Sequence, residues 1–182
     1  GAGVGGIYQI KRLTDLGINA TVLEAGGDLG GTWYFNRYPG ARFDSESYTY
    51  GYSFSKEVLD EWHWKEMFSG QPENLRYLNH VAEKFDLRQY MQFNCRVQAM
   101  HFDEANNLWC LTMDDRRTLT ARYVVTTVGL LSIPTPPRIE GMESFEGPSF
   151  HTFDWPHEPV DLTGKRVGII GTGATAIQVI GE

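Results

Sequence analysis

The sequence of 182 residues predicts an α/β protein, and three observations carry this prediction. Glycine-rich turns of the spacing Gly-x-Gly-x-x-Gly/Ala occur twice, as GAGVGG at residues 1–6 and GTGATA at residues 171–176. An amphipathic helical pattern follows the first turn, and an apolar segment ending in an acidic residue follows that helix. A second apolar segment precedes the second turn. This order is typical of dinucleotide-binding β-α-β units, so we expect two Rossmann-like domains.

The first turn has glycine where a bound pyrophosphate requires it. Gly1 allows the tight turn, Gly3 lets the pyrophosphate approach the backbone, and Gly6 lets the helix pack on the strand. The apolar stripe of the following helix ends at Gly17. Residues 20–25, ATVLEA, then read as a short buried strand.

The strand ends in Glu24, about 20 residues after the turn, where a ribose-binding carboxylate belongs. A carboxylate accepts hydrogen bonds from ribose hydroxyls and repels a 2′-phosphate. The first site therefore suits FAD or NAD and disfavours NADP.

Residues 26–47 predict a long loop rich in glycine and aromatic residues. Gly30 and Gly31 allow close backbone approach, and Thr32, Trp33 and Tyr34 could cover a flat ring. Arg42 and Asp44 add one charge of each sign. The residues fit a ligand-covering loop and a surface loop held by buried aromatic side chains equally well.

The middle of the chain predicts helices and then a β-meander. An amphipathic helix begins at Glu57, and a second covers residues 71–87 with a proline in its first turn. Residues 96–103, 108–113 and 118–129 are β-rich and separated by turn-prone residues. We expect an inserted meander whose last segment, residues 123–129, returns to the parallel sheet.

Residues 131–163 hold most of the prolines and predict a stiffened connection between domains. Beyond it, residues 167–170 read as a buried strand, Gly171, Gly173 and Ala176 form the second motif, and a helix begins at Ile177. The predicted domains are 1–130, 131–163 and 164–182. The first begins without its first strand and the last stops inside a helix, so we expect a chain truncated at both ends.

Composition limits the partners. Apolar residues make up 41% and charged residues 21%, as in soluble globular proteins. The net charge of −7 argues against a nucleic-acid partner, and no apolar run has the length of a membrane span. Cys95 and Cys110 lack the spacing of a redox pair, which argues against a disulfide reductase. We expect two reduced thiols, a cytoplasmic protein and no metal site.

The proline-rich connection contains FEGPSFHTFDWP, residues 145–156, which matches the FxGxxxHxxxWP motif of Baeyer–Villiger monooxygenases. Residues 30–47, GGTWYFNRYPGARFDSES, resemble the loop near the flavin in the same family. The similarity extends along the whole chain and is greatest to the branch acting on aryl ketones, steroids and other bulky ketones.

This resemblance implies an activity and its cofactors. NADPH would reduce FAD, O2 would add to the reduced flavin, and the resulting C4a-peroxyflavin would attack a ketone to give an ester or lactone. Two dinucleotide motifs in one chain fit this pairing of cofactors. The choice of NADP over NAD rests on the family alone, and the ketone, the regiochemistry and the oligomeric state stay open.

The resemblance also implies roles for individual residues. The FAD site would comprise Gly1, Gly3, Gly6, Glu24, Gly31, Thr32, Trp33, Asp44, Tyr50 and Val97. The NADP site would comprise Arg42, Phe43, Gly171, Thr172, Gly173, Ala174, Thr175, Ala176 and Ile177. The catalytic candidates are Asp44, Arg42, His151 and Trp155, together with an active-site arginine expected downstream of Glu182. Thr126-Thr127-Val128-Gly129 departs from the family pattern, so we expect altered packing there rather than lost binding.

His151 has three interpretations. A catalytic base suits the usual pKa of histidine, but the migration step needs no such base. We favour a role for His151 and Trp155 in coupling nicotinamide binding to domain movement, and a structural histidine is the third interpretation.

Two alternatives concern the whole chain. A flavin-containing monooxygenase that oxidises nitrogen or sulfur would share the fold and cofactors, although Trp155-Pro156 favours ketone oxidation. A catalytically incomplete FAD-binding fragment is the second alternative, and we expect these 182 residues to be inactive on their own.

Overall fold

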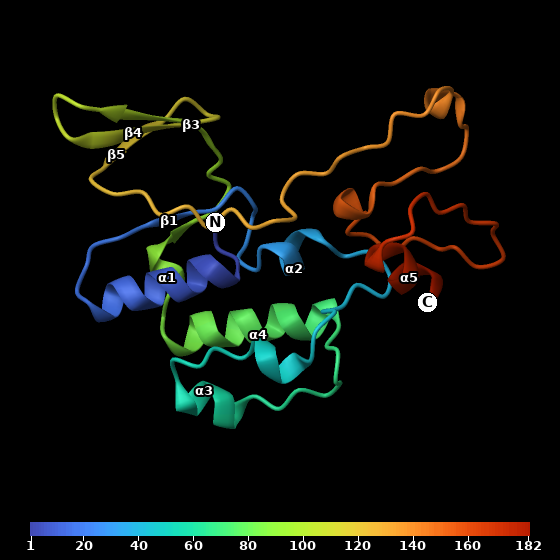
Figure 1. Ribbon diagram of the computed structural model, residues 1–182, viewed down its shortest axis with the longest axis horizontal. Coiled ribbons are helices and arrows are strands. Elements are labelled where there is room, and N and C mark those ends of the chain that lie inside the picture. Colours follow the sequence, from blue (N-terminus) through green and yellow to red (C-terminus); the bar gives the residue numbers. More distant parts are fainter. The chain divides into compact units, whose positions relative to one another are not determined.

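The computed structural model describes residues 1–182 and divides into two compact units. The first comprises residues 1–34 and 76–130, and the second comprises residues 35–75 and 131–182. Figure 1 colours the chain by residue number, so the two segments of each unit can be found in it. Helix α4 (Gln71–Lys84) begins in the second unit and continues into the first.

The first unit contains the expected helix and strand after the first glycine turn. Helix α1 covers Val4–Asp15, and strand β1 covers Val22–Leu23. Strand β2 (Met91–Gln92) pairs with β1 in parallel, Val22 opposite Met91, after the short helix η2 (Arg88–Tyr90). Both α1 and α4 contribute fully buried side chains to the core of this unit, among them Ile7, Ile10, Leu78, Val81 and Ala82.

The meander is confirmed. Strands β3 (Val97–Asp103), β4 (Leu108–Met113) and β5 (Thr118–Ala121) form an antiparallel sheet in that order, distinct from the β1–β2 pair in Figure 1. Its first turn is closed by the Asp103 carboxylate, which accepts a hydrogen bond from the backbone N–H of Ala105 at 3.0 Å. Hydrogen bonds from the side chain and backbone of Asn106 hold the pKa of Asp103 below its ordinary value.

Two predicted strands are absent. Residues 123–129 and 167–170 belong to no sheet, and apolar side chains in both are exposed, Tyr123 at 81% and Ile170 at 71%. The prediction of a buried strand at residues 167–170 is therefore wrong for this structure. A strand exists only through hydrogen bonds to a neighbour. No segment of residues 1–182 pairs with either run.

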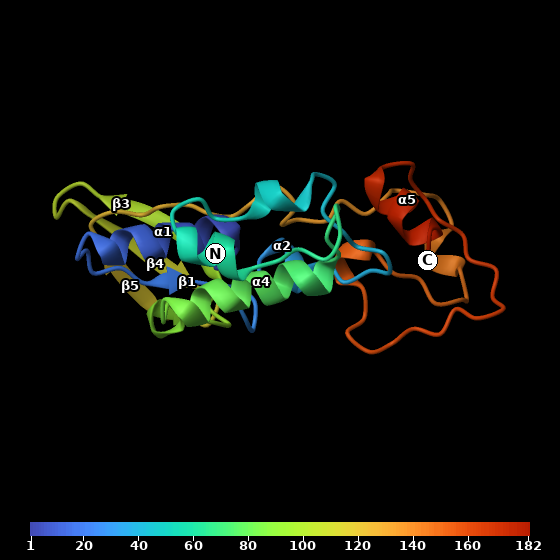
Figure 2. The same ribbon diagram turned by 90° about the horizontal axis from the view of Figure 1, so that it is seen from below.

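The second unit has little regular structure. Helix α3 (Lys56–Glu61) is capped by Ser55, whose Oγ accepts the N–H of Val58 at 3.3 Å, and it is shorter than the predicted amphipathic segment. Helix α2 (Thr32–Phe35) ends in this unit, and η1 (Ser47–Tyr50) follows it. Figure 2 shows the irregular course of residues 131–173 before helix α5 (Ala174–Ile180), interrupted by η3 (Met142–Ser144) and η4 (Thr152–Asp154). No helix has the length and apolar character that crossing a bilayer demands.

Candidate functional site

The first glycine motif packs against a second glycine turn in the same unit. Gly31 has φ of +53°, and a Cβ added there would lie 2.7 Å from Cα of Gly3. The N–H of Gly30 donates to the carbonyl of Ala2 at 3.0 Å. Gly30 and Gly31 were expected to allow close backbone approach, and their partner in the structure is the motif itself.

The amino end of α1 is free of competing side chains. Gly3 is the N-cap residue, no side chain caps the helix, and its first turn contains no acidic residue. A Cβ on Gly6 would lie 1.8 Å from the carbonyl oxygen of Gly1, so only glycine fits there. A helix N-terminus in this condition fits a phosphate group, because its N–H groups and dipole favour negative charge.

Glu24 is buried beside this motif, at 5% exposure. Its Oε2 accepts a hydrogen bond from the N–H of Ala2 at 2.5 Å, and its Oε1 accepts one from the N–H of Gly26 at 2.7 Å. A carboxylate oxygen can accept a second bond, so these contacts leave capacity for a ribose hydroxyl. Glu24 therefore braces the first glycine motif against the backbone at Gly26, a role that the sequence pattern did not indicate.

Thr127, in the segment that departs from the family pattern, also contacts the motif. Its Oγ1 donates to the carbonyl of Gly1 at 3.0 Å, and a Cβ on Gly5 would lie 3.6 Å from the Thr127 side chain. Gly129 has φ of +74°, a conformation that favours glycine. The departure thus places a hydrogen-bonding side chain against the glycine turn.

The aromatic residues of the long loop are mostly packed. Trp33 is 6% exposed, and the Tyr34 hydroxyl accepts the N–H of Gly27 at 3.2 Å. In the second unit, Tyr50 packs with Phe43 at a ring separation of 4.4 Å and with Trp64 at 6.5 Å. Thr32 and Val97 are half-buried. These contacts fit the interpretation of a loop held by aromatic side chains.

The segment of residues 41–43 is fixed to the start of α4. The N–H of Phe43 donates to the carbonyl of Ser69 at 2.9 Å, and the N–H of Gln71 donates to the carbonyl of Ala41 at 2.7 Å. Arg42 thereby forms an antiparallel bridge with Gly70. The segment that carries two candidate site residues is held by its backbone, independently of its side chains.

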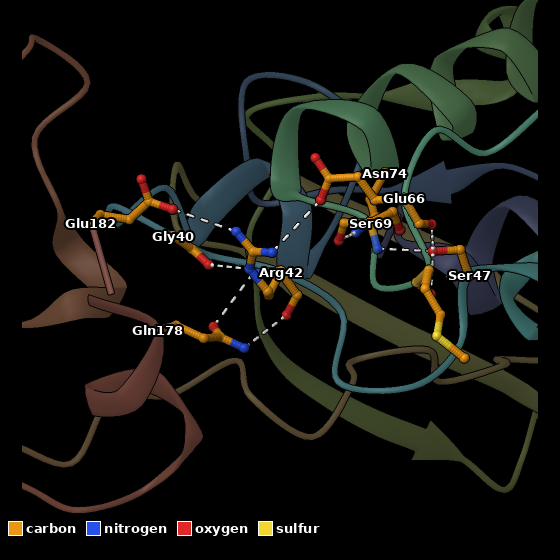
Figure 3. Close-up of polar contacts among 9 residues, drawn as sticks. Gly40, Arg42, Ser47, Glu66, Ser69, Asn74, Gln178 and Glu182 are labelled. Carbon is orange, nitrogen blue, oxygen red and sulfur yellow. Dashed lines mark hydrogen bonds and ion pairs between the residues drawn. The ribbon is translucent and has the colours of Figure 1, made fainter. Parts of the chain in front are cut away.

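A buried polar network supports this bridge (Figure 3). Ser69 and Asn74 are fully buried, with Ser69 Oγ to Asn74 Oδ1 at 2.5 Å and Asn74 Nδ2 to the Ser69 carbonyl at 3.0 Å. Ser47 Oγ accepts the N–H of Ser69 at 2.8 Å and donates to the carbonyl of Glu66, also at 2.8 Å. Since satisfied buried polar groups rigidify their surroundings, the network makes Ser69 a firm anchor.

The Arg42 side chain has acidic neighbours on two sides (Figure 3). Its guanidinium lies 3.4 Å from a carboxylate oxygen of Glu182 and 3.6 Å from one of Glu66. Its Nε donates to the carbonyl of Gly40 at 3.3 Å. Asp44 is exposed and forms no ion pair with Arg42. The two charges predicted at this loop are therefore not paired with each other.

The FxGxxxHxxxWP segment is organised by one turn of 3₁₀ helix. His151 is the N-cap of η4, and its Nδ1 accepts the N–H of Phe153 at 3.1 Å. The rings of Phe150 and Trp155 lie 5.4 Å apart across this turn, and Phe153 stacks on Phe35 at 5.6 Å. The spacing of histidine and tryptophan thus brackets a single capped turn.

The second glycine motif contrasts with the first. Gly171 has φ of +123° and Gly173 is the N-cap of α5, yet a Cβ on either would meet nothing within 4 Å. Thr172, Ala174 and Ile177 are exposed, Thr175 is half-buried, and Ala176 is 8% exposed. The helix predicted after the motif is confirmed, but no strand supports the turn from behind.

The whole chain, residues 1–182, matches the family model described as "Flavin-binding monooxygenase-like". The chain belongs to this family.

Several relatives of this chain have informative names. It is 48% identical to 2-oxo-Δ3-4,5,5-trimethylcyclopentenylacetyl-CoA monooxygenase of Pseudomonas putida, over 99% of this chain and 34% of the relative. It is 44% identical to acetone monooxygenase (methyl acetate-forming) of Gordonia sp. strain TY-5, over 99% of this chain and 34% of the relative. It is 42% identical to phenazine N-monooxygenase of Lysobacter antibioticus, over 99% of this chain and 33% of the relative.

Among solved structures, the crystal structure of OTEMO in complex with FAD and NADP has a TM-score of 0.93 and 48% identity. The match covers 99% of this chain and 35% of that one. The chain thus spans about a third of the length of the relatives it matches.

Several residues with a part in the site were not predicted from the sequence. Gly40 follows a proline, a turn signal that could have indicated its positive φ of 72°. Gln178 gave no signal, because a single polar residue on a short apolar helix resembles any solvated position. The network of Ser47, Ser69 and Asn74 depends on contacts between residues far apart in sequence.

Proposed function

We propose that the protein carrying this chain is a Baeyer–Villiger monooxygenase that uses FAD, NADPH and O2. One oxygen atom of O2 enters between a ketone carbonyl and its neighbouring carbon, giving an ester or lactone. The other leaves as water, whose hydrogens derive from NADPH and a proton, and NADP⁺ is released. The observation that carries the proposal is whole-chain similarity to a protein whose name describes conversion of acetone to methyl acetate.

FAD is assigned to the first motif and its neighbours. Gly1, Gly3 and Gly6 hold the pyrophosphate at the uncapped end of α1, and Glu24 accepts hydrogen bonds from the ribose. The flavin is assigned to Gly31, Thr32, Trp33, Asp44, Tyr50 and Val97. The glycine packing and the buried carboxylate support this assignment.

NADPH is assigned to the second motif, residues 171–177, with Arg42 and Phe43 beside it. Arg42 has a partly exposed guanidinium whose contacts to Glu66, Glu182 and the Gly40 carbonyl are all 3.3 Å or longer, so it can turn toward a phosphate. The cofactor pair supplies the reducing equivalents and the activation of O2, chemistry that side chains lack. We assign to Asp44, which is exposed and forms no ion pair with Arg42, the orientation of a cationic partner at the reaction site.

His151 and Trp155 are assigned to the connection between the two nucleotide sites rather than to proton transfer. The Nδ1 cap on η4 and the Phe150–Trp155 contact support a positioning role. The domains proposed are residues 1–130 for FAD, 131–163 for the connection and 164–182 for the start of the NADP domain. We also propose a cytoplasmic location, consistent with two free cysteines.

A second candidate function is oxidation of a ring nitrogen. The similarity to phenazine N-monooxygenase covers 99% of the chain at 42% identity, close to the 44% of the acetone enzyme. The names of the relatives range from an acetone monooxygenase to a monooxygenase for a bulky coenzyme A thioester, and for this protein we propose a bulky ketone. A chain of 182 residues that binds FAD without turnover is the remaining alternative.

In the deciding experiment, the complete gene product is incubated with NADPH, ¹⁸O2 and a panel of substrates. The panel contains one aryl ketone, one aliphatic ketone, one aryl sulfide and one N-heterocycle. Product masses are read with an enzyme-free control and a control lacking NADPH. Ester with a single ¹⁸O supports the proposal. Sulfoxide or N-oxide without ester assigns the protein to heteroatom oxidation.

A further inference from the structure

The side chain of Gln178 on α5 pairs with the backbone of Arg42 in the same unit (Figure 3). Its Nε2 donates to the Arg42 carbonyl at 3.1 Å, and its Oε1 accepts the Arg42 N–H at 3.4 Å. The Tyr38 hydroxyl donates to the same Oε1 at 2.8 Å. Donor and acceptor are both used, so the amide pairs with the backbone as a neighbouring strand would.

Gly40 makes this approach possible. With φ of +72°, it faces the backbone of α5, and a Cβ there would lie 2.3 Å from the carbonyl oxygen of Gln178 and 2.9 Å from Cγ of Glu182. The loop and the helix are therefore in backbone contact. No other residue type fits at Gly40 without separating them.

The ion pair next to this contact is weaker. Arg42 and Glu182 are both substantially exposed, at 40% and 50% of their side chains, and their closest atoms are 3.4 Å apart. Exposed pairs of this kind contribute little, because water screens them and both side chains lose entropy. The amide pairing, not the ion pair, defines how α5 sits on the loop.

The contact continues to a rigid anchor. Behind Arg42, the N–H of Phe43 is held by Ser69, and Ser69 is held by buried Asn74 of α4. The backbone around Arg42 is thus hydrogen-bonded on one side to the start of α4 and on the other side to the Gln178 side chain. A continuous series of hydrogen bonds therefore connects helix α5, which follows the second glycine motif, through the segment carrying Arg42 and Asp44 to helix α4.

We propose that Gln178 is a positioning residue that fixes the second glycine motif in place relative to the segment of residues 42–44. Resting on the proposed function, this predicts that Gln178 aligns the nicotinamide nucleotide with the flavin and leaves flavin binding unaffected. Asparagine is one methylene too short for the pairing, and glutamate lacks the donor for the Arg42 carbonyl.

The test compares Gln178→Met, Gln178→Glu and Gly40→Ala with Gln98→Met, the same chemical change at an exposed position of β3. The Arg42 N–H has Gln178 as its acceptor, so its hydrogen exchange reports the pairing directly. In the complete gene product, we expect exchange at residues 40–43 to rise about tenfold in Gln178→Met. Gly40→Ala should raise it as well, because the added Cβ separates the loop from α5. FAD content and exchange in α1 should match wild type and Gln98→Met.

The second readout is the apparent Kd for NADP⁺ and the rate of flavin reduction by NADPH. We expect reduction to slow about tenfold in Gln178→Met with FAD occupancy unchanged. Unchanged hydrogen exchange at residues 40–43 in Gln178→Met overturns the pairing of Gln178 with Arg42. Faster exchange together with unchanged NADP⁺ affinity and an unchanged rate of flavin reduction overturns the positioning role of Gln178. If wild type does not oxidise NADPH, the proposed function fails, and the exchange data alone then decide the pairing.

Discussion

At the scale of single residues, two side chains gain roles that their types alone did not indicate. His151 suggested proton transfer, yet its Nδ1 is engaged by the N–H of Phe153 within its own turn. Glu24 suggested a ribose contact, yet it also joins Ala2 to Gly26. Both side chains accept hydrogen bonds from backbone N–H groups, and each role can be tested by moving or removing the acceptor.

The His151 cap predicts different outcomes for two amide substitutions. Asparagine carries Oδ1 at the bond distance of Nδ1 and is a preferred N-cap residue, whereas glutamine carries its oxygen where Nε2 lies. We expect His151→Asn to keep stability and NADPH-dependent turnover near wild type. His151→Gln and His151→Ala should each lose about 1 kcal/mol of unfolding free energy, measured by denaturant titration. If His151→Gln retained turnover and His151→Asn lost it, the Nδ1 cap would be refuted, and the function of His151 would depend on Nε2.

The Glu24 brace predicts that removing one acceptor is costly. In Glu24→Gln, an NH2 group faces either the Ala2 or the Gly26 N–H, and a buried donor loses its partner. We expect a loss of about 2 kcal/mol in unfolding free energy, the usual scale for hydrogen bonds to charged groups. FAD retained after gel filtration should fall in parallel.

A matched control for the brace is Asp28→Asn, the same change from carboxylate to amide in the same unit. Asp28 pairs with Arg88 at a more exposed place, so we expect this variant to lose less than about 1 kcal/mol. Full stability of Glu24→Gln would exclude the brace.

At the scale of elements, the first unit depends on two glycine turns meeting backbone to backbone. Gly31 and Gly17 both have positive φ, but their surroundings differ: a Cβ on Gly31 meets Gly3, while one on Gly17 meets nothing within 4 Å. Substitutions at Gly17 and at Gly31 can therefore be compared to separate the effect of backbone strain from the effect of a steric clash.

We expect Gly17→Ala to lower unfolding free energy by about 1 kcal/mol, from strain alone. Gly31→Ala adds a clash that only a backbone shift relieves, so we expect a loss of about 3 kcal/mol or more and loss of bound FAD. Thermal unfolding and flavin absorbance measure both. Equal losses in the two variants would show that the contact between the turns contributes nothing.

At the scale of the whole molecule, the two glycine motifs have unequal support. The first is surrounded by Glu24, Gly31 and Thr127, whereas the second follows an exposed apolar run with no paired neighbour. The structure holds the second motif chiefly through α5 and its contact with the loop at Gly40.

This difference predicts a gradient of hydrogen exchange in the 182-residue chain. The N–H groups of residues 167–170 have no backbone acceptor, so we expect them to exchange at rates near those of an unstructured peptide. Amides in the middle of α1 and α4 should exchange at least about a hundredfold more slowly. Peptide-level mass spectrometry resolves these segments. Strong protection at residues 167–170 would reinstate the predicted strand.

Much of the fold could be predicted because its signals are local. The stripe of α1, the proline in the first turn of α4 and the turn residues of the meander each reflect a periodicity or a backbone preference within a few residues. The glycine motifs and FxGxxxHxxxWP are local in the same sense. Apolar content at residues 167–170 also predicted a strand, but it could not show whether a neighbour was there to pair with it.

Short-range spacing in the chain was enough to predict the helix and strand after the first glycine motif, the meander and the family. Only the folded structure shows that Glu24 braces the first glycine motif against Gly26, that His151 caps its own turn and that the Gln178 side chain pairs with the Arg42 backbone. The last of these joins residues 136 positions apart. A polar side chain has no preferred partner until folding brings a backbone group within hydrogen-bonding distance. No local sequence pattern predicts which backbone group that will be.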